Sequence, residues 1–382
     1  MANNNDNKVL NVPHLRFPEF SGEWKMCTIG ELTTKVGSGV TPRGGEAVYK
    51  TEGHPFVRSQ NVGLGNLLLD DIAFIDEETH LRQKSTELQF NDVLLNITGA
   101  SIGRSALVDK QIVGGNVNQH VCIIRTKENL VPSFICSFLL SNYGQRQIDS
   151  FQAGGNRQGL NFEQIKSIKI TIPSKDEQIK IAKLLRAIDE RIATQNKIIE
   201  KLQSLIKGIA QNVARNNKPN IRLSECLECS SSTLQESDVC KNGTYPVYGA
   251  NGIVGYLDNY NTEKEAVYII KDGSGVGTVS YVTGKCSATG TLNTLQAKEG
   301  YSLQYLYYML KVFNFEPYKT GMAIPHIYFK DYGKAKIFCP SYTEQLKYAR
   351  LLSAIDNKLS AEQSILTDLS LQKQYLLRQM FI

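Results

Sequence analysis

The sequence contains no stretch that approaches the roughly 18 uninterrupted apolar residues of a membrane-spanning helix. Residues 1–17 also lack the basic segment followed by an apolar one that marks a signal peptide. These two absences argue against a membrane span and against export. By default they predict a cytoplasmic protein with no membrane partner.

Cysteine is present but forms no recognisable framework. The eight cysteines are scattered, and without an export signal this favours reduced, mostly buried thiols over disulfides. Cys226 and Cys229 form one CxxC pair, but a structural zinc site needs a second pair at ligand spacing. Cys240 and Cys286 do not supply that pair, so we predict no metal site.

Motifs for catalysis and cofactor binding are also missing. The sequence has no Asn-Pro-Pro-aromatic or Asp-Pro-Pro-aromatic tetrapeptide of an amino-methyltransferase, no glycine-rich turn suited to S-adenosylmethionine and no GxxxxGK[ST] loop for ATP. The glycine-rich run 273–277 misses the spacing of a dinucleotide loop, so we interpret it as a β-turn in preference to a phosphate cradle. We therefore predict a non-catalytic chain that binds no cofactor of its own.

The net charge of +6 does not by itself indicate a nucleic-acid partner. Basic and acidic residues balance at 17 against 17 in residues 1–170 and at 11 against 11 in residues 219–341. The excess, 10 against 5, lies in residues 171–218. A basic helical face is more often solvated than bound to DNA, so charge alone does not decide the function.

What the sequence does contain is a long internal repeat. Ile170–Leu202 returns 167 residues later as Ile337–Leu369, with 14 of 33 positions identical without a gap. This period is too long for a solenoid, so it indicates two domain-sized segments, each followed by the same helical element. Upstream of the repeat the two segments differ in length and loops. We therefore expect the scaffold to be duplicated and the variable part not to be.

Each copy opens with a Pro-Ser-x-x-Glu-Gln segment that predicts a capped helix start, with Ser174 and Glu177 as the capping box of the first copy. Apolar positions then alternate in steps of four and three, which is typical of a coiled coil and predicts a first helix of about 60 Å. A globular segment lies between the copies, so we expect the two helices to pack antiparallel.

The seam between these helices has polar residues at one equivalent point. Its predicted members are Leu185, Ile188, Ile192, Gln195, Ile199 and Leu202 in the first copy, and Leu352, Ile355, Leu359, Glu362, Leu366 and Leu369 in the second. Because Gln195 and Glu362 interrupt the apolar seam at the same place, we predict that they fix its register.

These patterns predict an α+β fold with two domains separated by two long antiparallel helices that form a coiled coil, and with a pseudo-two-fold internal repeat. Short β-rich runs fill both globular segments, and one helix is expected from Pro132 to about Ile148. The predicted boundaries are 1–172 for the first domain, with 1–13 disordered, 173–218 for the first helix and linker, 219–340 for the second domain and 341–382 for the second helix.

Both globular segments carry polar, glycine-punctuated loops. They are residues 38–43, 58–61, 98–104, 116–120 and 154–159 in the first segment, and residues 248–252, 271–274, 289–293 and 319–322 in the second. Arg, Asn, Gln, Ser and Thr read base edges, Arg and Lys grip phosphate, and Gly lets the backbone come close. Any single loop of this kind is more often an ordinary turn.

Four features together resemble one family. They are Pro13–Phe17 with Gly22–Trp24, the segment Gly37–Pro42, the segment Tyr245–Gly252 and the duplicated Pro-Ser-x-x-Glu-Gln helices. With them the chain resembles the specificity subunit of type I restriction-modification systems. The resemblance implies two target-recognition domains, one for each half of a split, asymmetric double-stranded DNA sequence, with the helices as a spacer between them.

The resemblance also implies partners and cofactors. It implies two modification subunits that methylate adenine with S-adenosylmethionine, and restriction subunits that translocate DNA with ATP and Mg; this chain would bind none of these cofactors itself. By analogy, the predicted DNA contacts are Arg43, Arg58, Gln60, Arg104, Asn118, Arg157, Asn251, Lys271 and Lys319. The alternatives are a DNA methyltransferase with attached recognition domains, which the missing motifs disfavour, and a coiled-coil adaptor with no DNA role.

Overall fold

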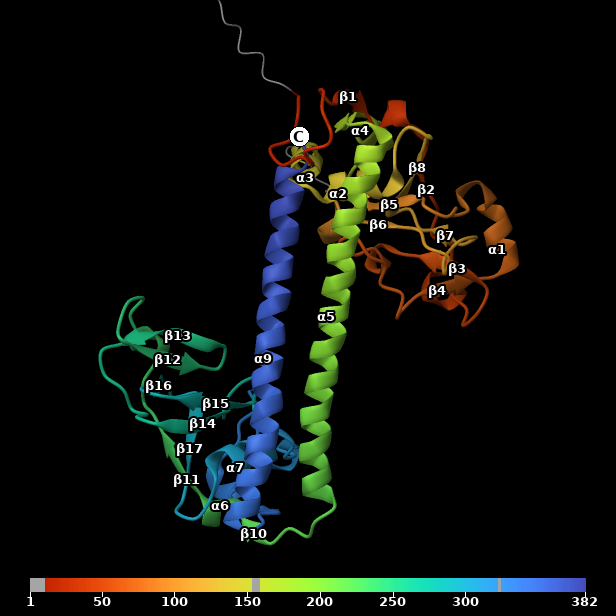
Figure 1. Ribbon diagram of the computed structural model, residues 1–382. Helices are drawn as coiled ribbons and strands as arrows, with labels where there is room; N and C mark the ends of the chain where they lie inside the picture. Colours follow the sequence, from red (N-terminus) through yellow and green to blue (C-terminus); the bar gives the residue numbers. More distant parts are fainter. Residues whose placement is uncertain (1–10, 153–158, 322–323) are drawn as a thin grey trace, which may run out of the picture. The chain divides into compact units, whose positions relative to one another are not determined.

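The computed structural model describes residues 11–152, 159–321 and 324–382 (Figure 1). The chain divides into two compact units, Met1–Thr194 with Leu366–Ile382, and Gln195–Ile365. Each of the two long helices begins in one unit and ends in the other. The domain boundaries expected at residues 172, 218 and 340 therefore stay a prediction.

The first unit contains three small sheets. A four-stranded sheet has the order β2 (Thr33–Ser38), β8 (Val121–Thr126), β5 (Val93–Asn96), β6 (Ser105–Leu107). A three-stranded sheet has the order β4 (Ala73–Ile75), β3 (His54–Val57), β7 (Asn116–Val117), and β1 (Lys25–Thr28) pairs with β9 (Lys169–Ile172). Among the strands described in this unit, β3 and β7 are the one parallel pair. The helices are α1 (Glu77–Arg82), α2 (Pro132–Leu140), α3 (Asn142–Ser150) and α4 (Phe162–Ser167).

The second unit repeats this topology strand for strand. Its four-stranded sheet has the order β11 (Leu227–Ser231), β17 (Leu292–Ala297), β14 (Glu265–Ile270), β15 (Val279–Thr283). Its three-stranded sheet has the order β13 (Gly252–Leu257), β12 (Tyr245–Gly249), β16 (Ser287–Ala288), and β10 (Ile221–Arg222) pairs with β18 (Lys336–Ile337). Again one pair, β12 and β16, is parallel. The helices are α6 (Leu223–Cys226), α7 (Leu303–Lys311) and α8 (Phe329–Tyr332).

The duplication therefore extends further than the sequence led us to expect. The prediction that the upstream parts of the two segments are not duplicated is wrong for the strands, because all nine pair in the same order in both units. Strand pairing is carried by backbone hydrogen bonds, which tolerate almost any change of side chain. What differs is the connections: α1 lies between β4 and β5, whereas β13 runs into β14 without a helix.

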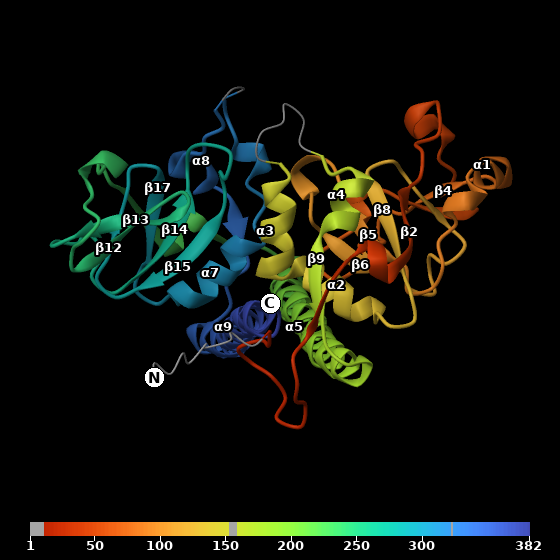
Figure 2. The same cartoon turned by 90° about the horizontal axis from the view of Figure 1, so that it is seen from above.

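The apolar core of the first unit joins the sheets to both long helices. In Figure 2, α2 lies against the strands of the four-stranded sheet, and it buries Phe134 and Phe138 completely. Phe381 packs on both rings, with centroids 5.2 and 6.2 Å away. Leu185 belongs to the same buried cluster. The single helix expected from Pro132 breaks at Ser141, whose Oγ accepts a hydrogen bond from the Gly144 N–H and begins α3.

The two long helices, α5 (Lys175–Arg215) and α9 (Tyr342–Gln379), are antiparallel (Figure 1). Every predicted seam residue is buried or half-buried. In the second unit, Gln195 Nε2 donates to the Glu362 backbone oxygen at 2.9 Å and also to its carboxylate. Lys358 pairs with the same carboxylate, and these two bonds lower the pKa of Glu362. In the first unit, Lys373 pairs with Asp189 at 2.5 Å.

The residues before β1 hold the start of α5. Arg16 binds Glu177 through two nitrogens, each 2.8 Å from a carboxylate oxygen, and Glu177 is 1% exposed. The Glu177 side chain therefore binds Arg16, whereas its backbone N–H donates to Ser174 Oγ at 3.4 Å, as one half of the predicted capping box requires. Asn11 exchanges hydrogen bonds with Trp24, so the disorder expected for residues 1–13 is wrong for residues 11–13. Residues 1–10 lie outside the described part of the chain.

Candidate nucleic-acid interface

The sheet topology of the first unit gathers several predicted loops at one place. In an antiparallel order β2-β8-β5, the end of β2, the start of β8 and the end of β5 lie along the same edge. The connections at this edge are residues 39–44, 118–120 and 97–104. Because β3 and β7 are parallel and β7 leads into β8, residues 58–61, which follow β3, lie at this edge too. We call this set of connections the polar edge.

One close backbone approach defines the polar edge. A Cβ on Gly39 would lie 1.7 Å from the backbone oxygen of Val117, so only glycine fits after β2. Beyond it, Thr41 donates from its backbone N–H to Gln119 Oε1 at 2.9 Å. Gln119 Nε2 lies 3.0 Å from His120 Nε2, and His120 Nδ1 lies 2.6 Å from Thr98 Oγ1. The loops are thus joined by side chains as well as by the sheet.

A buried asparagine connects two of the loops at the polar edge. Asn96, the last residue of β5, is 0% exposed. Its Nδ2 donates to the Ser59 backbone oxygen at 2.8 Å and to Ser101 Oγ at 3.1 Å. These two bonds tie residues 58–61 to the turn between β5 and β6.

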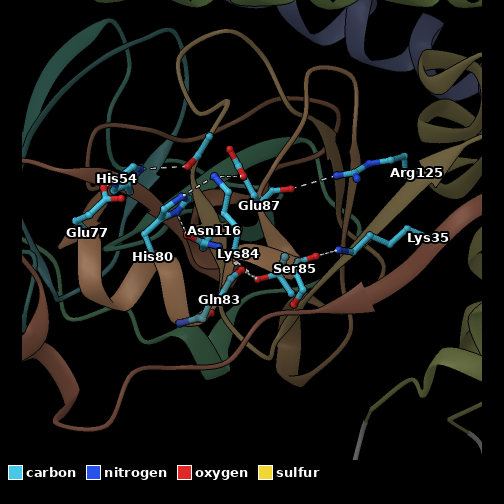
Figure 3. Close-up of polar contacts among 12 residues, drawn as sticks. Lys35, His54, Glu77, His80, Gln83, Lys84, Ser85, Glu87, Asn116 and Arg125 are labelled. Carbon is cyan, nitrogen blue, oxygen red and sulfur yellow. Dashed lines mark hydrogen bonds and ion pairs between the residues drawn. The ribbon is translucent and has the colours of Figure 1, made fainter.

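A series of polar contacts runs from β3 and α1 towards the loop after β2, and Figure 3 shows its members His54, His80, Asn116 and Gln83. The rings of His54 and His80 stack with centroids 3.8 Å apart, and His80 Nδ1 lies 2.7 Å from Asn116 Oδ1. Asn116 Nδ2 donates to the Gln83 backbone oxygen at 3.0 Å, and Gln83 Oε1 accepts from the Val40 N–H at 3.1 Å. This chain of contacts links the histidine pair to the loop after β2.

A second set of contacts holds the residues after α1 to the sheet, and Figure 3 shows Arg125 reaching the Glu87 backbone oxygen and Lys35 reaching that of Ser85. Arg125 clamps the buried Asp92 with two bonds of 2.7 Å, and these raise the pKa of the guanidinium. Lys35 donates to the Ser85 backbone oxygen. Burial and the nearby Arg125 lower the pKa of Lys35. The cationic side chains of Arg125 and Lys35 thus bind groups of the first unit itself.

The second unit builds an equivalent edge with different side chains. The Lys271 N–H donates to the Thr291 oxygen at 3.0 Å, as the Ile97 N–H donates to the His120 oxygen at 3.0 Å. The turn 273–277 follows β14 with the backbone bonds of 99–103, and the first and last glycine of each turn have positive φ. The glycine-rich run is thus a turn between strands. Here the side-chain contact is between Thr289 Oγ1 and Thr291 Oγ1, 2.8 Å apart.

Four residues predicted to contact DNA are already bonded within their own unit. Arg58 donates to the backbone and carboxylate of Asp71, and Gln60 donates to the same carboxylate. Asn118 is 7% exposed and accepts from the His120 N–H. Lys319 Nζ forms an ion pair with Glu316 Oε1, 2.6 Å away.

The remaining predicted contacts are placed differently. Arg43, Arg104 and Asn251 are exposed, and Lys271 is half-buried. Arg157, with its loop 154–158, lies outside the described residues. That any of the nine residues touches DNA stays a prediction. The side chains that the structure joins at the polar edge, Thr98 and Gln119 among them, lay in the predicted loops but were not singled out, because their mutual contacts leave no trace in sequence spacing.

The side chains that commonly bind metals are dispersed in the described part of the chain. No three His, Cys, Asp or Glu residues there are grouped as metal ligands. Six of the eight cysteines are buried, and burial raises the pKa of Cys136 to about 11. Within the same residues, no helix has the length and apolarity to cross a membrane.

Comparison with known proteins identifies the family. The model of the type I restriction modification DNA specificity domain matches residues 21–204 and again residues 219–370. The chain belongs to this family. The two matches each cover one set of sheets and much of the long helix that follows it, so the specificity domain is present twice.

Individual relatives agree with this assignment. A putative type I specificity subunit of Mycoplasma genitalium is 25% identical over 320 residues, which cover 76% of this chain and 81% of the relative. The EcoKI specificity subunit of Escherichia coli is 23% identical over 202 residues, 50% of this chain and 41% of the relative. The crystal structure of a type I restriction-modification S subunit from M. genitalium has a TM-score of 0.66 at 19% identity, covering 97% of this chain and 99% of that one. This likeness shows a shared fold.

Proposed function

We propose that this chain is the DNA-recognition subunit of a type I restriction-modification system, and that each of its two specificity domains reads one half of a split DNA target. The observation that carries the proposal is a duplicated β scaffold whose equivalent edges present different side chains. One scaffold with two sets of polar groups suits two different half-sites. The target is therefore asymmetric.

The long helices suit the role of spacer. A helix of 41 residues extends about 60 Å, which exceeds the roughly 34 Å of one turn of B-DNA. Both ends of α5 are built into sheet-containing units, so a change in helix length would change the gap between the half-sites. The buried Gln195–Glu362 bond fixes one register of the two helices.

The chain assembles with other subunits to act. Two modification subunits supply S-adenosylmethionine-dependent methylation, and restriction subunits supply ATP- and Mg-dependent translocation and cleavage. The near-neutral charge of both globular segments is consistent with tight DNA binding that depends on these partners. We propose that the complex works in the cytoplasm, in keeping with its proposed action on genomic DNA.

Methylome sequencing tests the proposal directly. The full chain is co-expressed with its modification subunit in a host free of other adenine methylation, and methylated positions are mapped. We expect one motif with two unlike halves and a fixed unread gap. Omitting this chain is the control and should abolish the motif. A palindromic motif, or methylation that is the same without the chain, would refute the proposed function.

A further inference from the structure

The hydrogen bonds of the polar edge have a direction that can be worked out atom by atom. The backbone N–H of Thr41 can only donate, and it points at Gln119 Oε1, 2.9 Å away. This contact fixes which end of the Gln119 amide is oxygen and which is nitrogen. Gln119 Nε2 is therefore the atom 3.0 Å from His120 Nε2, and an amide nitrogen can only donate.

The hydrogen bond from Gln119 determines which ring nitrogen of His120 carries the proton. Since His120 Nε2 accepts a hydrogen bond, the ring proton lies on Nδ1, and the imidazole is neutral. His120 Nδ1 then donates to Thr98 Oγ1, 2.6 Å away. The Thr98 oxygen is thus an acceptor in this series of hydrogen bonds, and the hydroxyl hydrogen is available to a further partner.

The outcome is two donors at an accessible edge. Gln119 is exposed, and one of its two Nε2 hydrogens is used by His120. The second hydrogen has no partner among the residues that the structure describes. This Nε2 hydrogen and the Thr98 hydroxyl hydrogen are therefore two available donors of the polar edge. Thr41 and His120 hold Gln119 in place, and His120 also holds Thr98.

We propose that Gln119 and Thr98 are base-reading side chains of the first specificity domain, that they donate to acceptor atoms of a base edge, and that His120 is the positioning residue that orients both. This inference rests on the proposed function and names the groups that perform it. The acceptors that match are N7 and O6 of guanine, N7 of adenine and O4 of thymine in the major groove.

The second domain supplies an internal control, because it lacks this arrangement. Thr291 takes the place of His120, as the shared backbone bond to the end of the neighbouring strand shows. Asp272 takes the place of Thr98, and Gly290 that of Gln119. Changes to the donors of the first domain should therefore alter one half-site and leave the other as it was.

Thr98→Val tests one donor alone, and Gln119→Glu tests the pair by a change of hydrogen-bond polarity. Thr98→Val keeps the shape of the side chain and removes its hydroxyl, so discrimination at one base pair of one half-site should fall at least about fivefold. Gln119→Glu keeps the acceptor for Thr41 and replaces the outward donor with an acceptor. It also replaces the donor to His120 Nε2 with an acceptor, so His120 must carry a proton on that nitrogen in this variant. The variant's preference at one base pair should move towards the amino groups of cytosine or adenine.

The matched control is Gln111→Glu, which adds the same charge at an exposed position of the same domain. Each variant is assembled with the modification subunits, and binding is measured on a duplex carrying the mapped motif and on duplexes with each base pair of either half changed. Thermal unfolding confirms that each variant folds. Ratios of affinities between duplexes, rather than affinities, are compared, because a new carboxylate weakens binding to every duplex.

The expected result is an altered preference at one or two neighbouring base pairs of one half-site in Thr98→Val and Gln119→Glu, with Gln111→Glu unchanged. Unaltered preferences in both variants, or equal losses in both half-sites, would overturn the inference. A wild-type complex that prefers no duplex would instead refute the proposed function, which makes the two failures distinguishable.

Discussion

The glutamine of the repeated Pro-Ser-x-x-Glu-Gln segment has a structural task that can be measured. Gln178 Oε1 accepts from the Val131 N–H at 2.9 Å, and its Nε2 donates to the backbone oxygens of Asn129 and Pro173, each at 3.1 Å. Gln178 is 1% exposed. It therefore joins the start of α5 to the start of α2, the helix that covers the four-stranded sheet.

Its counterpart does the same with one bond fewer. Gln345 Oε1 accepts from the Ser302 N–H, the N-cap residue of α7, and Nε2 donates to the Pro340 oxygen, both at 2.9 Å. Each buried neutral hydrogen bond is worth about 1 kcal/mol, and more when the partner is left unsatisfied. Gln178→Leu should thus cost about 3 kcal/mol locally, and Gln345→Leu about 2 kcal/mol.

Hydrogen exchange followed by mass spectrometry can resolve these two changes in the full chain. A loss of about 3 kcal/mol should speed exchange of the amides of α2 roughly 100-fold where they open locally. Gln178→Leu should act on α2 and leave α7 unchanged, and Gln345→Leu should do the reverse. If either variant accelerates both helices equally, or neither, the glutamines do not carry the junctions and this reasoning is wrong.

Three further changes have defined expectations. Replacing Gln195 and Glu362 together with Leu should raise the midpoint of thermal unfolding but loosen the register, so methylome mapping should find more than one gap length; a single retained gap would contradict this. Gly39→Ala places a Cβ 1.7 Å from the Val117 oxygen, and it should impair recognition of one half-site while the other is still read. Cys240 is the exposed cysteine of the eight, so a maleimide should label the native chain rapidly at that thiol, and Cys240→Ser should remove the fast phase; rapid labelling of several thiols would argue against the burial described.

The features that sequence could predict are those with a periodic or repeated pattern. The steps of four and three identified the helix pair, and the 167-residue repeat identified two segments that share an ending. The nine-strand correspondence could not be predicted, because it rests on backbone pairing. Equivalent strands such as β5 and β14 share a place in their sheets while their sequences differ.

The candidate site was harder to predict for a related reason. Sequence located the loops by their Gly, Asn and Thr content, but the choice of residues within them followed charge. Charged and polar side chains such as Arg58 and Lys319 are engaged by nearby acids, which a loop sequence does not reveal. The contact between Thr98 and His120 joins residues 22 positions apart across two connections, so only the sheet order brings them together.

Backbone and side chains have different roles, which explains how one scaffold can carry two different recognition sites. At the equivalent edges, the bonds of Ile97 and Lys271 to their neighbouring connections are made by N–H and C=O groups, which every non-proline residue supplies. The side chains on these connections are free to differ, and they do: the first domain has contacts among Gln119, His120 and Thr98, whereas the second has a contact between the hydroxyls of Thr289 and Thr291. Stability therefore depends on the strands and the helix junctions, whereas recognition, as we propose it, depends on side chains whose replacement leaves the backbone bonds intact. A scaffold built in this way can acquire a new half-site without losing its fold, and two copies of it in one chain need not read the same one.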